Sequence, residues 1–187
     1  MIAEFSSDDA LLLAAREGSR EAFGLLAMRY RDALTRYAYR YVRDRHEAGD
    51  VAQEALLRAF RHLDTFQRDR SFQTWLFVIA RNAAFDVLRR RERIAAGAVP
   101  DEGIPSSAPG PEERAVRDDE ARIVRCALAA LPGRYREPIE LYYLSGLRYR
   151  DIALVLGLPI GTVKTHIARA KQRLRNALED VQFESVA

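Results

Sequence analysis

The sequence of 187 residues contains a single cysteine, Cys126. An intrachain disulfide needs two cysteines and a cysteine-based zinc cluster needs several, so both are excluded. We expect Cys126 to be a buried structural thiol, which is the usual environment of a free cysteine. A redox role for this residue stays open.

Long apolar stretches are also absent. No segment approaches the roughly 20 apolar residues of a membrane-spanning helix, and the apolar run that begins at Leu11 ends at Arg16. The residues before it, Met1 to Asp9, carry acids where a signal peptide would be basic. The sequence therefore predicts a cytoplasmic protein with no membrane insertion.

Proline is absent up to Val99, and four of the seven prolines then fall between positions 100 and 111. Prolines at this density prevent a helix from continuing. The same stretch is acidic and has no aromatic residue, so it cannot bury itself in a core. We expect a flexible, acidic, Pro/Gly-rich linker at residues 96–116, between a first domain at 1–95 and a second at 117–187.

No stretch alternates between apolar and polar residues as a strand does, whereas apolar residues recur at three- and four-residue spacing on both sides of the linker. This periodicity predicts an all-α fold of two small helical domains. We expect a short helix that Ser7 or Asp8 caps and Gly18 ends, then a long helix that starts at Ser19. The next helix is expected at about 47–63, and a polar loop at 64–70 leads into a fourth helix. The second domain is expected to contain helices at about 118–131, 135–145, 149–156 and 160–179.

Two apolar stripes mark the sides of these helices that are expected to face inward. On the third helix the stripe consists of Val51, Ala55, Leu56, Ala59 and Phe60. On the fourth it consists of Trp75, Ile79, Ala83 and Val87. We expect Trp75, which lies on this stripe, in the core rather than stacked on a base.

Acidic residues are absent from position 152 to position 178, in a chain whose formal net charge is only +3. The same segment contains Lys164, Arg169, Lys171, Arg173 and Arg175. A local basic block of this kind indicates a site for a polyanion.

A helix-turn-helix is predicted within this segment, from Tyr149 to about Arg175. Gly157 stands at the turn, where a left-handed backbone is needed, Ala153 stands where the helices cross, and Thr162 is a candidate cap of the second helix. The pattern predicts DNA binding, although similar helix pairs and basic helix faces also occur in proteins that bind no DNA. The second helix would present residue types that contact guanine edges and phosphates, namely Lys164, Thr165, His166, Arg169, Lys171 and Arg173.

Two polar groups lie on the helices predicted in the first domain. The group on the third helix consists of Asp50, Gln53, Glu54 and Arg58. The group on the fourth helix consists of Asn82, Asp86, Arg89 or Arg90, and Arg93. The second group forms a polar-to-basic face that suits phosphates and exposed bases, but both groups also fit an ordinary solvated surface.

The sequence gives no indication of an enzyme. The three histidines, His46, His62 and His166, form no metal-ligand spacing. There is also no phosphate-binding glycine loop and no nucleophile arrangement. We therefore expect no catalytic residue, no metal and no cofactor.

Three motifs, in order along the chain, resemble the extracytoplasmic-function (ECF) sigma factors of the sigma-70 family. Residues 47–60, EAGDVAQEALLRAF, resemble the region 2 helix that binds the polymerase clamp, although Gly49 stands where the family usually has an acid. Residues 72–82, FQTWLFVIARN, with the polar residues that follow, resemble the promoter-melting and −10-reading segment. A third set of segments resembles region 4, which reads the −35 element. It consists of residues 131–137, 146–147, 151–153 and 161–169.

The resemblance implies a transcription initiation factor that binds the clamp and flap regions of core RNA polymerase and directs it to specific promoter DNA. An anti-sigma protein is the family's usual further partner. The implied polymerase-binding group is Asp50, Gln53, Glu54 and Leu57. The implied −10 group is Phe66, Phe72, Asn82, Asp86, Arg89 and Arg90, with the 64–72 loop holding a flipped base close to the two phenylalanine rings. The implied −35 readers are Lys164, Thr165, His166 and Arg169, with Lys171 and Arg173 on phosphates.

A free-standing DNA-binding regulator, whose N-terminal helices dimerise or sense a signal, is the alternative. It would share the helix-turn-helix. It gives no reason, however, for the patterns between Asp50 and Glu54 and between Phe72 and Arg90.

Overall fold

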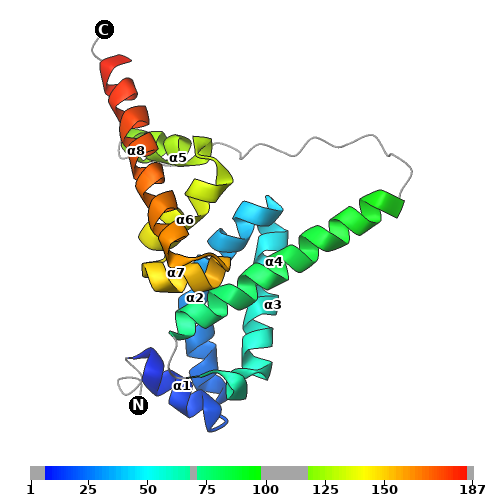
Figure 1. Ribbon diagram of the computed structural model, residues 1–187. Helices are drawn as coiled ribbons and strands as arrows, with labels where there is room; N and C mark the ends of the chain where they lie inside the picture. Colours follow the sequence, from blue (N-terminus) through cyan, green and yellow to red (C-terminus); the bar gives the residue numbers. More distant parts are fainter. Residues whose placement is uncertain (1–6, 68–70, 98–117, 185–187) are drawn as a thin grey trace. The chain divides into compact units, whose positions relative to one another are not determined.

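The computed structural model describes residues 7–67, 71–97 and 118–184, and the chain divides into two compact units, Met1–Pro100 and Asp101–Ala187. The described residues form helices and no strand (Figure 1). This confirms the predicted all-α fold with two small helical domains. Each unit has its own set of packed helices and is described by itself.

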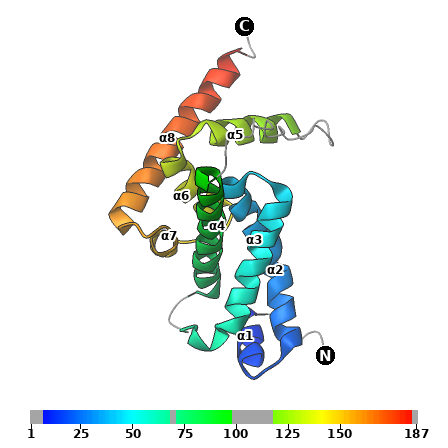
Figure 2. The same cartoon turned by 90° about the vertical axis from the view of Figure 1, so that its right-hand side faces the viewer.

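The first unit is built around its second helix. Its elements are α1 (Asp8–Arg16), α2 (Arg20–Val42), α3 (Arg45–Arg61), the short 3-10 helix η1 (Leu63–Thr65) and α4 (Phe72–Gly97). Helix α2 packs against α1, α3 and α4, and α3 also packs against α4. Figure 2 shows α2 and α3 side by side over most of their length.

Serine side chains cap the first two helices, as predicted. Ser7 Oγ accepts a hydrogen bond from the Ala10 amide at 3.3 Å, and Ser19 Oγ accepts one from the Ala22 amide at 3.1 Å. Gly18 lies between the two helices with φ +102°, a conformation that favours glycine. These local signals set the boundary between α1 and α2.

The buried side of α4 differs from the predicted stripe. Ala83 is buried, but Trp75, Ile79 and Val87 are only half-buried. The buried residues next to them are Leu76, Phe77, Ala80 and Ala84. Helix α4 packs against both α2 and α3, so its buried side is wider than a single stripe of residues. This buried side is centred one position later along the helix than the predicted stripe.

The buried side of α3 follows the prediction with one exception. Val51, Ala55, Leu56 and Ala59 are buried, whereas Phe60 is 39% exposed. One side of the Phe60 ring still packs on Phe23 of α2, with ring centroids 4.9 Å apart. Phe60 therefore lies at the border of the core and belongs partly to the outer surface of α3.

The second unit consists of α5 (Asp118–Ala130), α6 (Gly133–Tyr143), α7 (Tyr149–Leu156) and α8 (Ile160–Glu184). Helix α8 packs against each of the other three. Its buried side includes Val163, Ile167 and Ala170, and Ala170 shares a cluster with Leu131 and Tyr135. The unit is therefore organised along α8.

Helices α7 and α8 form the predicted helix-turn-helix. Gly157 ends α7 in the left-handed conformation, with φ +66°, as the turn requires. The prediction that Thr162 caps the second helix is wrong. Helix α8 begins at Ile160, and the amides of Thr162 and Val163 donate to the Pro159 carbonyl at 2.9 and 3.1 Å, so Thr162 lies inside the first turn.

The predicted linker at 96–116 lies outside the described residues, except for Ala96 and Gly97. These two residues belong to α4, so the last helix of the first unit continues past the predicted boundary at 95. Among the described helices no single one is both long and apolar enough to cross a membrane. By length and composition alone, the bent pair Tyr149–Leu156 and Ile160–Glu179 would together be long and apolar enough.

Candidate functional site

The outer face of α3 carries the polymerase-binding group that the resemblance implies. Asp50 and Gln53 are exposed, and Leu57 is 42% exposed. Phe60, which was expected to face inward, extends this face with a second large apolar side chain. An acid, an amide and two exposed apolar side chains thus lie at three- and four-residue spacing on one side of the helix, an arrangement typical of a protein-binding surface.

Glu54, the remaining member of this group, is half-buried and pairs with an arginine of its own helix. Its carboxylate accepts from Arg58 Nε at 2.7 Å. Arg58 Nη1 in turn donates to Asp86 of α4 at 2.8 Å, and Asp86 also accepts from Arg89 Nη2 at 2.6 Å. A continuous chain of ion pairs therefore joins the predicted polymerase-binding group to the predicted −10 group.

Hydrogen bonds within this chain shift the acidities of its members. The pKa of Asp86 lies below its ordinary value, chiefly because Arg58 and then Arg89 donate to the carboxylate. The pKa of Arg58 is raised, chiefly by its hydrogen bond to Asp86 and then by the one to Glu54. Sequence reasoning placed Arg58 near Glu54 but assigned it no role, because Asp86 lies 28 positions away.

The polar members of the −10 group lie along α4. Asn82, Arg89 and Arg90 are exposed, and Asp86 is half-buried. Asp86, Arg89 and Arg93 also line one shallow surface depression. The structure thus brings together the polar-to-basic stripe that the spacing predicted.

The two phenylalanines of the −10 group are not the free rings that sequence reasoning expected. Phe66 and Phe72 are each only 5% exposed, and their ring centroids lie 5.7 Å apart. Trp75 packs against both rings, at 5.2 and 5.9 Å, and Tyr30 packs against Phe72 at 5.7 Å. Both rings therefore lie inside an aromatic cluster of the first unit rather than at its surface.

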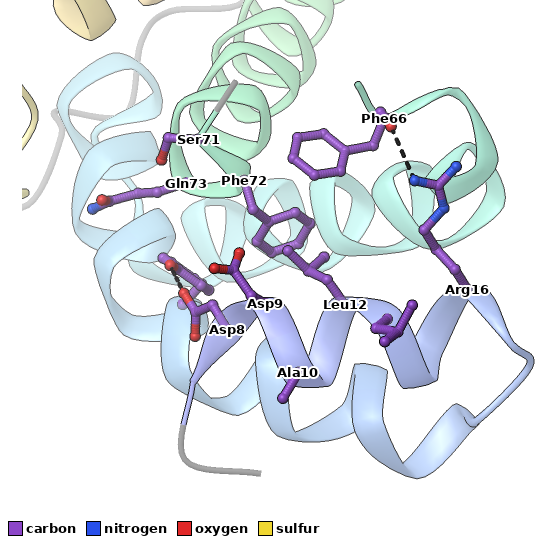
Figure 3. Close-up of a pocket in the computed structure, with 11 residues that line it drawn as sticks. Asp8, Asp9, Ala10, Leu12, Arg16, Phe66, Ser71, Phe72 and Gln73 are labelled. Atoms are coloured by element: carbon purple, nitrogen blue, oxygen red, sulfur yellow. Dashed lines mark hydrogen bonds between the residues drawn. The ribbon is translucent and has the colours of Figure 1, made fainter. Parts of the chain in front are cut away.

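The same rings form one wall of a cavity of about 560 Å³ whose other wall is α1 (Figure 3). Ser71 and Gln73, at the start of α4, also line it. Part of the predicted 64–72 loop, residues 68–70, lies outside the described residues. The cavity is thus next to the segment that the resemblance assigns to a flipped base.

Helix α1, to which sequence reasoning assigned no role, holds the chain at this wall. The Arg16 guanidinium donates to the Phe66 carbonyl oxygen at 3.5 Å (Figure 3). It also donates to the Asp64 carbonyl oxygen at 3.3 Å. The Tyr30 hydroxyl donates to the Asp8 carboxylate, and burial together with this hydrogen bond raises the pKa of Tyr30. These contacts link α1 both to α2 and to the chain before the loop.

The predicted −35 residues lie on α8, where they divide between an exposed face and two flanks. Lys164, Thr165 and Arg169 are exposed, and the Thr165 hydroxyl donates to the Gly161 carbonyl at 2.9 Å. His166 is half-buried. The exposed residues lie opposite the buried side of α8. In a recognition helix, this exposed side is the one that can enter a DNA groove.

Aromatic side chains of α6, which sequence reasoning did not select, contact the flanks of α8. Lys171 Nζ lies 5.5 Å from the ring centroids of both Tyr142 and Tyr143. The pKa of Lys171 is raised, chiefly by a hydrogen bond with Tyr143. Arg173 lies over the Tyr135 ring, 5.5 Å from its centroid. These two cations are therefore exposed but held against the unit, as side chains that contact phosphates from a fixed position would be.

The expectation that Cys126 is buried is wrong. The thiol is exposed and lies in a shallow apolar groove that Ile123, Ala130 and Ala177 also line. Helix α5 is covered on one side only, so most of its residues from 122 to 126 remain open to solvent. Within the described ranges, no group of three or more His, Cys, Asp or Glu residues could hold a metal ion.

Comparison with known families identifies both units. The model of sigma-70 region 2 matches residues 26–94, and that of sigma-70 region 4 matches residues 121–174. The first match contains α3 and most of α4, and the second contains the helix-turn-helix.

Similar proteins extend over nearly the whole chain. The ECF RNA polymerase sigma factor SigW of Bacillus subtilis is 33% identical over 175 residues, which cover 89% of this chain and 94% of that protein. The ECF RNA polymerase sigma-E factor of Escherichia coli is 33% identical over 187 residues, covering 95% and 97% of the two chains. Among solved structures, the sigma factor RpoE of Bartonella quintana, in complex with the anti-sigma factor NepR, matches with a TM-score of 0.67 and 30% identity, over 84% of this chain and 96% of that one. The chain therefore belongs to the sigma-70 family, as an ECF sigma factor that directs RNA polymerase to promoters.

Proposed function

We propose that three surfaces of this chain divide the work of promoter recognition. The outer face of α3 binds core RNA polymerase, α4 reads the −10 element, and α8 reads the −35 element. The proposed domains are 1–95 and 117–187, with 96–116 as the linker that lets the two readers span separated DNA elements.

The exposed combination of Leu57 and Phe60 beside Asp50 and Gln53 is the observation that carries the proposal. Large apolar side chains are 42% and 39% exposed on a helix whose opposite side is fully packed. Apolar anchors surrounded by polar residues are the usual centre of a protein–protein interface. We propose that Glu54 contributes mainly by holding Arg58 and only secondarily by direct contact with the polymerase.

For the −10 element, we propose that Asn82, Arg89 and Arg90 contact DNA along α4. Asp86 orients Arg89, since its carboxylate accepts from that guanidinium at 2.6 Å. Phe66 and Phe72, the two rings of the 64–72 loop, contribute to this site from the aromatic cluster that they form with Trp75. A base that leaves the stack costs a few kcal/mol, which contacts made by that loop would offset.

For the −35 element, we propose that Lys164, Thr165 and Arg169 reach base edges from the exposed face of α8. Arg and Lys pair with guanine O6 and N7, and Thr contacts several bases. His166 is half-buried and contributes from the border of this face. Lys171 and Arg173, held against aromatic rings, neutralise phosphates.

Further proposals concern partners and place of action. We propose that an anti-sigma protein binds this chain, because the similar sigma factor of Bartonella quintana was solved with one, and that it masks the α3 face. The chain would act in the cytoplasm, where RNA polymerase is, with no membrane insertion. We assign it no reaction of its own and no cofactor.

The test is binding to bacterial core RNA polymerase, measured by co-elution and by titration of a fluorescently labelled chain. A variant with Asp50→Arg and Leu57→Ser changes the proposed interface without touching the Arg58 ion pairs. Losing a central apolar anchor and a charge at an interface costs about 2 kcal/mol or more, so we expect affinity to fall about 30-fold or more.

The matched control makes the same charge reversal and a comparable apolar-to-serine change on α2, where Asp32 and Met28 are both exposed. Asp32→Arg with Met28→Ser is expected to bind core as the unchanged protein does. Equal loss in both double variants would remove α3 as the specific interface. A folded unchanged protein that fails to bind core at micromolar concentration would favour the free-standing regulator instead.

A further inference from the structure

We propose that Tyr135 of α6 is a positioning residue that sets the guanidinium of Arg169 for discrimination among −35 bases. The inference rests on the proposed function, which assigns Arg169 to the −35 element. Tyr135 does not itself touch DNA in this account. It acts from the core of the second unit through the side chain of Arg169.

The Tyr135 ring is fixed in place. It is 3% exposed and belongs to the buried cluster that also contains Leu131, Ile139 and Ala170. Ala170 lies on α8 directly after Arg169 in sequence, so the ring contacts the same turn of the recognition helix. A buried ring in a packed cluster has one rotamer, and its hydroxyl therefore has one position.

That hydroxyl contacts the exposed side chain of Arg169. Arg169 Nη1 donates to Tyr135 Oη at 3.4 Å, and this hydrogen bond is the main cause of a lowered pKa of Tyr135. The two residues are 34 positions apart, so the contact is tertiary. It holds one nitrogen of the guanidinium and leaves the others free to reach a base.

Further cationic and aromatic side chains gather at the same ring. The guanidinium of Arg134 lies 4.8 Å from the ring centroid and that of Arg173 lies 5.5 Å from it. The His166 ring meets the Tyr135 ring edge-on at 5.4 Å. Cations over an aromatic face are attracted to it, so these groups add to the contacts that hold the Tyr135 ring in place.

Restricting Arg169 matters because base recognition depends on direction. A bidentate contact to a guanine edge needs a guanidinium whose plane and height are set, whereas a contact to phosphate tolerates many geometries. An arginine whose side chain is already restrained loses less side-chain entropy when it binds DNA. It also has fewer conformations in which it could pair with a neighbouring phosphate instead of the base. The Tyr135 hydroxyl should therefore affect discrimination among bases more than overall affinity for DNA.

Tyr135→Phe in the full chain tests this, because it removes the hydroxyl and keeps the ring in its cluster. The variant is combined with core RNA polymerase, and its affinity is measured for promoter fragments that carry each single substitution in the −35 element. One net hydrogen bond corresponds to about a 3- to 10-fold change. We expect the preference at one −35 position to fall by that factor, with preference at the other positions and binding to core unchanged.

Tyr142→Phe is the matched control, since it removes the same atom from the same helix at a residue that contacts Lys171 rather than Arg169. It should leave the preference at the position affected by Tyr135→Phe unchanged. The double variant Tyr135→Phe/Arg169→Ala should discriminate no worse at that position than Arg169→Ala alone, because Tyr135 acts through Arg169.

The outcomes separate this inference from the proposed function. If Arg169→Ala changes preference at one −35 position but Tyr135→Phe does not, the role of Tyr135 is refuted and the −35 assignment stands. If Tyr135→Phe weakens binding to every promoter variant equally, its role is structural and the inference is wrong. If Arg169→Ala relaxes no position, both the assignment of Arg169 and this inference are overturned.

Discussion

Arg58 of α3 and Asp86 of α4 form an ion pair, with Nη1 and Oδ2 2.8 Å apart. It lies in the middle of the chain of charges from Glu54 to Arg89. The pair therefore connects the helix that we assign to the polymerase with the helix that we assign to the −10 element.

The first prediction concerns the strength of this pair. Because its side chains are 36% and 44% exposed, solvent screens it, and we expect a coupling free energy of about 0.5–1 kcal/mol. A double-mutant cycle with Arg58→Ala and Asp86→Asn, read by urea unfolding, measures it. Asp32→Asn on the exposed side of α2 is the control, and strictly additive effects of the cycle would mean that the pair makes no net contribution to stability.

The second prediction is a pH dependence that Asp86 imposes on stability. Its folded-state pKa lies below the ordinary value of about 3.9, so its stabilising contribution is present above that value and disappears as pH falls through the folded-state pKa. The difference in free energy of unfolding between the unchanged protein and Asp86→Asn should be constant from about pH 7 to pH 5 and shrink below about pH 4. Urea titrations at a series of pH values measure it, and a difference that grows toward acid would contradict the pairing.

The third prediction concerns the turn of the helix-turn-helix. Gly157 has φ +66°, and a Cβ added there would meet nothing within 4 Å, so Gly157→Ala introduces backbone strain without a clash. We expect it to lower the free energy of unfolding by about 1–2 kcal/mol. Gly161→Ala, also in open space but without positive φ, should be neutral or slightly stabilising. Equal effects of the two changes would show that the left-handed turn is not required.

The fourth prediction assigns Arg169 to a base rather than to phosphate. Arg169→Ala should cost about 1–3 kcal/mol on the preferred promoter and relax the preference at one −35 position. Affinity measurements on promoter fragments with single −35 substitutions check this. An equal loss on all fragments would place Arg169 on phosphate.

The fifth prediction concerns the only cysteine. Since the Cys126 thiol is exposed, it should react with a thiol-specific reagent in the folded protein about as fast as in denaturant. Absorbance after addition of an aromatic disulfide reagent follows the reaction, and Cys126→Ser serves as the blank. A thiol that reacts only after unfolding would be buried, as the sequence suggested.

Local signals made much of the fold readable from the sequence. Ser7 and Ser19 cap helices through amides only three residues away, and Gly157 adopts the left-handed turn at the position that the motif spacing indicates. Helix caps and turns depend on residues that are close in the sequence, so they can be predicted without knowledge of the tertiary packing. Thr162 shows the limit, because the Pro159 carbonyl begins the helix one turn earlier.

Burial could not be read from spacing with the same success. Phe66 and Phe72 look like free rings beside a polar loop, yet both lie in an aromatic cluster with Trp75. The predictions for Phe60 and Cys126 were wrong in the opposite direction. Their apolar character suggested burial, but both are exposed. How many neighbours cover one side of a helix depends on packing that periodicity does not specify.

The sequence by itself determined the helical character, the two domains and the chemical types on α3, α4 and α8, because helix periodicity and composition are properties of contiguous residues. Only the tertiary structure decided which of those residues act together. Arg58 meets Asp86 across 28 positions and Arg169 meets Tyr135 across 34. Such contacts exist only after helices pack, since the distance between two side chains far apart in the chain is set by the packed core and not by the residues between them.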